Sequence, residues 1–128
     1  TIGIGDVAMT LREAREYVAR GFVVLKVKIG EDLELDVERL VRLREQVGSS
    51  IGIRVDGNVG YRPAQLLPLL QRTASLGLEF VEQPLPHDRI DAQRLLPAPL
   101  VDRLMADESL HSEVDARALA ALPRPFGL

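Results

Sequence analysis

The chain has 128 residues, 46% of them apolar, and a formal net charge of −3, which suits a single domain with a real hydrophobic core. Its Lys and Arg residues are dispersed, without the basic stripe that binds nucleic acid or the polybasic cluster that anchors to membranes, so we expect neither partner. The lack of cysteine excludes disulfides and thiolate metal sites, and without a basic-flanked leader or an apolar run near ~20 residues we expect a soluble, cytoplasmic protein.

Strand-like and helix-like segments alternate five times along the chain, which is the pattern of a parallel sheet with crossover helices. The first helix opens with a capping box at Thr10 and Glu13. The third helix has Pro63 in its first turn, where proline fits well, and Pro68 inside it, where proline favours a kink or a later start. We predict strands at 2–5, 23–29, 51–55, 79–81 and 104–106, and helices from Thr10 to a stop at Gly21 and at 33–47, 63–77, 91–96 and 112–122.

Asp56, Glu82 and Asp107 each close a short apolar run, and they stand 26 and 25 residues apart, about one strand, one helix and two loops. Because successive parallel strands end at the same edge of a sheet, the three carboxylates should converge there. Converging carboxylates repel one another, and a hard divalent cation with a preference for oxygen ligands offsets that repulsion. The sequence therefore predicts a Mg²⁺ site.

Lys26 and Lys28 lie two residues apart in an otherwise apolar strand, so their side chains share one face of the sheet. In a closed barrel that face is the interior. There the charge of each lysine disfavours protonation of the other, and partial burial acts in the same direction, so one lysine could act as a general base near neutral pH. The competing interpretation is an edge strand whose lysines prevent aggregation. The acidic trio on the following strands favours the catalytic interpretation, because a lysine beside a metal can abstract a proton next to a carboxylate.

Four strand-end motifs follow one another in a fixed order and carry a family resemblance. They resemble the motifs of the enolase superfamily, in its muconate lactonizing enzyme subgroup, over essentially the whole chain. The motifs are Lys26-Val-Lys28, Val55-Asp56-Gly-Asn58, Val81-Glu82-Gln83-Pro84-Leu85 and Ala106-Asp107-Glu108-Ser109.

The resemblance implies an α/β fold, a partial (β/α)8 TIM-type barrel of about five βα units in one domain over residues 1–128. It implies Mg²⁺ held by Asp56, Glu82 and Asp107, with Lys28 as the acid/base and Lys26 as the neighbour that tunes it. The shared reaction of this subgroup is abstraction of the proton α to a substrate carboxylate, followed by epimerisation, cycloisomerisation or dehydration.

Within the subgroup, Thr1-Ile-Gly-Ile4 and Gly21-Phe22 are most similar to dipeptide epimerases, with a muconate-type cycloisomerase or o-succinylbenzoate synthase as alternatives. The implied partner is a small carboxylate such as a dipeptide, and the barrel faces could form homo-oligomers. Residues 125–128 look like the approach to a sixth strand. Since the resemblance places a second base on that strand and a capping domain elsewhere, we expect this stretch alone to be inactive.

Two interpretations from other classes of protein compete with the interpretation of the chain as an enolising enzyme. A phosphoacceptor receiver domain also has five βα units, but its pattern calls for an acid pair, a Ser or Thr and a Lys-Pro where this chain has Gly5-Asp6, Glu82 and Asp107. These mismatches count against it. A barrel fragment that retains ligands without turnover is the other alternative.

Several residues near the predicted strand ends admit a functional and a structural interpretation. Asn58 could orient a ligand but is favoured as a turn former. Tyr61 is favoured as a packing residue, and His87 and His111 as solvated loop residues. Glu108 could support the metal site or could simply be a loop acid.

Overall fold

The computed structural model describes residues 1–122, so the sixth-strand approach predicted at 125–128 lies outside the described residues. It contains one parallel sheet of four strands in the order β1-β2-β3-β4. The strands are β1 Val24–Lys28, β2 Gly52–Asp56, β3 Leu78–Glu82 and β4 Leu104–Met105. The helices are α1 Val7–Ala19, α2 Leu33–Val47, α3 Pro63–Arg72, α4 Ala98–Val101 and α5 Glu113–Ala120, with 3-10 segments η1 Ala74–Leu76 and η2 His87–Leu95.

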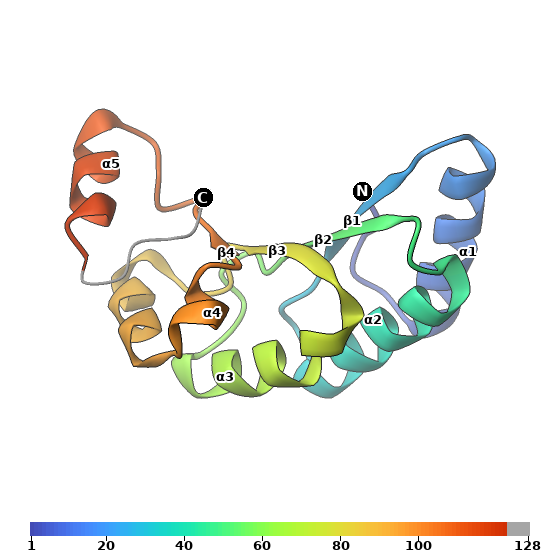
Figure 1. The fold of residues 1–128 in the computed structure, drawn as a ribbon, viewed down its shortest axis with the longest axis horizontal. Helices are drawn as coiled ribbons and strands as arrows, with labels where there is room; N and C mark the ends of the chain where they lie inside the picture. The colour runs from blue at the N-terminus through green and yellow to red at the C-terminus, as the bar shows by residue number, and fades with distance from the viewer. Residues whose placement is uncertain (123–128) are drawn as a thin grey trace.

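The helices follow one side of the sheet in an arc (Figure 1). Helices α2, α3 and α4 lie along that side, α1 lies beyond β1, and α5 lies at the opposite end of the sheet beyond β4 (Figure 1). The other side of the sheet carries no helix in the described part of the chain. Within residues 1–122, no helix has both the length and the apolar character needed to cross a bilayer.

The strand predicted at 2–5 is reduced to a single parallel bridge between Ile2 and Val27. The Ile2 amide donates to the Lys26 carbonyl at 2.8 Å, and the Ile2 carbonyl accepts from the Lys28 amide at 2.9 Å. Glycines lose much conformational freedom in a strand and offer no side chain to pack, which limits strand formation in a segment with glycine at two of its four positions.

The first helix begins earlier than predicted. Asp6 is its N-cap and accepts the Met9 amide at 2.7 Å, so the capping box at Thr10 and Glu13 is not used. Thr10 instead lies within α1, where its hydroxyl donates to the Asp6 carbonyl at 3.0 Å. Asp is among the strongest N-cap residues, and it stands before a run that suits a helix.

The later predicted elements occur in the predicted order but differ in length, and the helix α4 was not predicted. The third helix ends at Arg72 with Pro68 inside it, and η1 completes the predicted span. Residues 91–95 of the helix predicted at 91–96 form part of η2, a 3-10 segment rather than an α-helix, and β4 has two residues. The final helix has Ser112 as its N-cap, as predicted.

The core lies between the sheet and the helices. Alternate strand residues, among them Leu25, Val27 and Val55, are at most 3% exposed and face α2 and α3. Their neighbours on β1, Lys26 and Lys28, are only partly buried and occupy the opposite face of the sheet. This alternation separates an apolar face covered by helices from a polar face on which the strand-end side chains gather.

The loops that follow β1 and β2 approach each other backbone to backbone at Gly30 and Gly60. A Cβ atom on Gly60 would lie 2.2 Å from the Gly30 carbonyl oxygen, and Gly30 has φ +121°, which a residue with a side chain rarely adopts. Glycine at both positions therefore allows the two loops to pack.

We predict that Gly60→Ala destabilises the protein by about 1–3 kcal/mol, because the added methyl must push the loops apart. Gly3→Ala is the control, since a Cβ there meets no heavy atom within 4 Å, and it should change stability by less than about 0.5 kcal/mol. Urea unfolding of both variants at the full natural length of the protein measures the difference. Equal costs would show that the loops do not pack this closely.

Candidate metal and acid/base site

The carboxyl ends of the strands lie in register at one edge of the sheet. Lys28 is the Cα partner of Asp56, Asp56 is the partner of Glu82, and Glu82 is the partner of Met105. Asp107 follows two residues after Met105, at the end of β4. The structure therefore brings the strand-end residues named from the sequence to one edge, as parallel pairing requires.

A register shift between β2 and β3 produces this alignment. Where β2 advances from Ile53 to Val55, β3 advances from Leu78 to Val81, one residue more. With an even register, Asp56 would pair with Val81, and Glu82, one residue further on, would face the helices, because strand side chains alternate between faces. The shift thus places the Glu82 carboxylate on the same face as the Asp56 carboxylate.

Arg54 occupies the polar face at the shift and contacts two consecutive residues of β3. Its Nε lies 2.6 Å from Oε2 of Glu79, and its guanidinium carbon lies 5.3 Å from the centroid of the Phe80 ring. Arg54 thus holds Glu79 by an ion pair and Phe80 by a cation–π contact, and these are the two residues of β3 within the irregularity.

The two lysines lie on the same face, as predicted, and both contact the strand-end acids. Lys26 Nζ lies 3.0 Å from Oδ2 of Asp56 and 2.8 Å from Oε1 of Glu82, and Lys28 Nζ lies 3.3 Å from the same Asp56 oxygen. Lys28 also donates to Oδ1 of Asn58. The lysine side chains are 32% and 38% exposed, so both are partly buried, as expected.

The electrostatics of this edge are set by competition between burial and charge. Burial raises the pKa of Glu82, and the neighbouring acids Asp107 and Asp56 act in the same direction against the hydrogen bond from Lys26. Burial also acts to raise the pKa of Asp56, but hydrogen bonds from Lys26, the Asn58 amide and Lys28 outweigh it and hold that pKa below its usual range.

The pKa of Lys26 is raised, contrary to the expectation that the lysine pair and burial would lower it. Burial alone acts to lower it, but the hydrogen bonds and charges of Glu82 and Asp56 prevail. Both carboxylates lie within 3.0 Å of the Lys26 ammonium, and each favours its charged form.

The donor set fits Mg²⁺ in its chemistry. Asp56, Glu82 and Asp107 supply only oxygen ligands from neighbouring strand ends. The pKa of Glu82 is raised by burial first and then by the nearby acids Asp107 and Asp56, whose negative charge a divalent cation would offset. In the arrangement described, Lys26 neutralises two of these acids, and within residues 1–122 no three acidic or histidine side chains are grouped closely enough to hold an ion. A cation would compete with Lys26 for Asp56 and Glu82.

Gln83 builds the loop that carries Asp107, a role that its place in a motif does not reveal. It is fully buried with φ +34°, a left-handed conformation that costs energy for a residue with a side chain. Its Oε1 accepts the amides of Asp107 at 3.0 Å and Ser109 at 3.2 Å, and its Nε2 donates to the Leu85 carbonyl and the Ser109 hydroxyl, both at 2.8 Å. Because β4 has only two residues, this amide replaces the missing ladder hydrogen bonds.

Asn58 combines both interpretations considered for it. Its φ of +43° marks a turn, while its side chain accepts from Lys28 and donates to Oε1 of Glu108 at 3.2 Å. The other oxygen, Oε2 of Glu108, is buried without a hydrogen-bond partner among residues 1–122. His87 and His111 are exposed in loops or at element ends, as expected.

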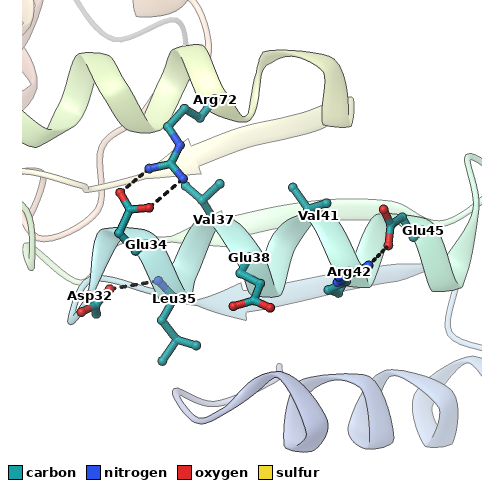
Figure 2. A pocket seen from close by; sticks show the side chains of 9 residues that line it. All are labelled: Asp32, Glu34, Leu35, Val37, Glu38, Val41, Arg42, Glu45 and Arg72. Atoms are coloured by element: carbon teal, nitrogen blue, oxygen red, sulfur yellow. Dashed lines mark hydrogen bonds and ion pairs between the residues drawn. The ribbon is translucent and has the colours of Figure 1, made fainter.

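A pocket on the outside of α2 is distinct from this edge (Figure 2). Glu34 and Arg72 form a two-bond ion pair between α2 and α3, and Arg42 pairs with Glu45 at 3.1 Å (Figure 2). None of its lining residues is a strand-end residue. The lining residues are Asp32, Glu34, Leu35, Val37, Glu38, Val41, Arg42, Glu45 and Arg72.

We predict that Gln83→Met destabilises the protein by about 2–6 kcal/mol, because the buried Ser109 amide and the part-buried Asp107 amide lose their acceptor at about 1–3 kcal/mol each. Ser109→Ala is the matched control, since it removes one partner of the same amide and should cost only about 1 kcal/mol. Chemical unfolding of both variants measures the costs. Similar values would mean that Gln83 does not hold the Asp107 loop.

Comparisons with known proteins agree with this architecture. The chain is 49% identical over 128 residues to the L-Lys-D/L-Arg epimerase of Methylococcus capsulatus, covering 100% of this chain and 36% of that protein. A crystal structure of the dipeptide epimerase from Methylococcus capsulatus with Mg and the dipeptide L-Arg-D-Lys superposes with a TM-score of 0.92 at 49% identity, over 98% of this chain and 35% of the other.

A more distant solved structure has the same fold. The muconate lactonizing enzyme from "Mucobacterium Smegmatis" matches with a TM-score of 0.81 at 31% identity, over 92% of this chain and 34% of that one. The chain thus spans about a third of the length of the relatives it matches.

These matches confirm the predicted fold class, a partial (β/α)8 barrel, with four parallel strands and one bridge in place of five strands. The family described as "Enolase C-terminal domain-like" matches residues 9–123, which is most of the sequence. This chain therefore belongs to the Enolase C-terminal domain-like family, the barrel domain of the enolase superfamily.

Proposed function

We propose that this chain carries the metal site and one acid/base lysine of a Mg²⁺-dependent dipeptide epimerase. The observation that carries the proposal is the edge at which Lys26 and Lys28 contact Asp56 and Glu82 within 3.3 Å. The likeness to the Methylococcus capsulatus dipeptide epimerase, at 49% identity, supports the substrate class.

Asp56, Glu82 and Asp107 would hold the Mg²⁺, whose charge, when it is bound, offsets the negative charge that develops on the substrate carboxylate. Asp56 and Glu82 raise the pKa of Lys26. A bound cation that offsets their negative charge would therefore favour the neutral amine of Lys26. The cluster therefore couples metal occupancy to the protonation of Lys26.

Lys28 is the proposed base for the α proton. Its Nζ contacts Asp56 at 3.3 Å and Asn58, so two neighbours fix the direction of a flexible side chain. As a neutral amine it takes the proton from the α carbon and becomes the ammonium, and returning the proton regenerates the amine. Lys26 lies deeper among the carboxylates and is proposed to tune this exchange.

A cycloisomerase is the second candidate, supported by the muconate lactonizing enzyme structure at 31% identity. The lower identity ranks it behind an epimerase. A single domain over residues 1–128, a cytoplasmic location, homo-oligomers through barrel faces and the inactivity of this stretch alone remain predictions from the sequence.

We predict that Asp56→Asn weakens Mg²⁺ binding by at least about tenfold. Removing a residue that only hydrogen-bonds to a metal ligand already lowers metal affinity by about this factor, and Asp56 is a proposed ligand itself. Asp102→Asn is the control, because this acid is exposed at the end of α4, away from the strand-end motifs. Calorimetric titration of Mg²⁺ into the protein at its full natural length gives both affinities. Equal binding by the two variants would contradict the ligand assignment.

We predict that Lys28→Ala and Lys28→Arg each slow exchange of the substrate α proton by about 10²–10⁴-fold. The arginine variant retains the positive charge beside Asp56 but cannot act as a base, because guanidinium does not deprotonate in proteins. Proton NMR of L-Lys-L-Arg in D₂O with Mg²⁺ follows the exchange. Full exchange by the arginine variant would rule out Lys28 as the base.

A further inference from the structure

A buried polar network lies on the helix side of β1, opposite to the face that carries the Lys28 side chain. Arg39 is 0% exposed, and Asp36 and Tyr61 are each 2% exposed. None of the three belongs to the strand-end motifs. Burying an arginine and an aspartate costs several kcal/mol unless every polar group has a partner, so their partners show what the network holds.

The Arg39 guanidinium donates to four groups from different parts of the fold. Its Nη1 donates to the Lys28 carbonyl at 3.0 Å and to Oδ1 of Asp36 at 3.1 Å. Its Nη2 donates to the Gly3 carbonyl at 2.7 Å, and its Nε donates to the Thr10 hydroxyl at 2.8 Å. Arg39 thereby fixes the end of β1 against α1, α2 and the N-terminal segment.

Asp36 joins the two loops that leave the candidate site. Its Oδ2 accepts the Gly30 amide at 2.9 Å and the Tyr61 hydroxyl at 2.7 Å. Gly30 follows Lys28 by two residues, and Tyr61 lies in the loop that begins with Asp56. One carboxylate therefore ties together the backbones on which the proposed base and its acidic neighbour stand.

The chemistry of Tyr61 suits a permanent donor. Burial raises the pKa of its phenol, and the hydrogen bond to Asp36 acts in the same direction. The hydroxyl therefore stays protonated, and the packing expected from the sequence is joined by a specific polar contact. The Gly30–Gly60 approach lies beside this contact, so the loops are held by both shape and hydrogen bonds.

We propose that Asp36, held by Arg39, is a positioning residue that sets the separation of Lys28 from Asp56 and Asn58 by joining the loops after β1 and β2. The inference rests on the proposed function, because that function makes this separation matter. Groups that orient a reacting side chain from behind affect rate strongly, since small displacements of a base reduce productive geometry. A network that only stabilises the fold would change unfolding without changing turnover.

The test uses Tyr61→Phe in the protein at its full natural length, because this change removes one hydrogen bond to Asp36 and keeps the ring in the core. Tyr17→Phe is the matched control, since its hydroxyl donates to the Thr1 carbonyl at 3.3 Å at an exposed position. With L-Lys-L-Arg and saturating Mg²⁺, we expect kcat of Tyr61→Phe to fall about tenfold. The KM and the Mg²⁺ affinity should match those of the control.

Amide hydrogen exchange provides a readout that needs no activity. In Tyr61→Phe the Gly30 amide should exchange about tenfold faster than in Tyr17→Phe, because its acceptor Asp36 loses the hydrogen bond from Tyr61 and is held less firmly. Faster exchange with lowered kcat supports the inference. Unchanged exchange, or faster exchange with kcat equal to that of the control, overturns it.

The same experiment separates this inference from the proposed function. If the wild-type protein fails to exchange the α proton of L-Lys-L-Arg, the proposed function is wrong for that substrate. The exchange of the Gly30 amide then decides by itself whether Asp36 joins the two loops.

Discussion

The arrangement of the site depends on parallel pairing that brings Asp56 and Glu82 side by side. Two carboxylates at adjacent strand ends repel each other, and this repulsion must be offset by positive charge. In the structure Lys26 does so, with contacts of 3.0 and 2.8 Å to the two acids. The same charge balance explains why the edge suits a divalent cation and why a lysine there can exchange protons when the balance changes.

One face of the sheet contributes to stability, and the other face carries the candidate site. The helix-covered face packs apolar residues such as Leu25 and Val55, and it also hides the Asp36–Arg39 network. The open face carries the charged residues. Because each strand side chain faces one side only, a backbone held rigidly from the packed face positions groups on the other. Long lysine side chains gain most from this support, since they have many rotamers to lose.

The sequence predicted the order of strands and helices and the edge where the acids meet, because apolar runs that end in acids mark strand ends clearly. It misplaced the start of α1, since Asp6 and Thr10 are both good cap residues and only the fold selects Asp6. It could not reveal Gln83 or Arg39 as organising residues, because key partners lie far away in the sequence: Asp107 and Ser109 are 24 and 26 residues from Gln83, and Gly3 is 36 residues from Arg39. Nor could it reveal the register shift in β3, which depends on how neighbouring backbones pair.

That shift has a consequence for anyone who transplants the site to another barrel. Copying the identities of the acids and lysines is insufficient, because Glu82 reaches the open face only when β3 holds one residue more than β2 over the same length. The count of residues between Leu78 and Glu82 is therefore part of the chemistry. A scaffold with ideal, evenly matched strands would carry the same residues, but the side chain at the position of Glu82 would face its helices.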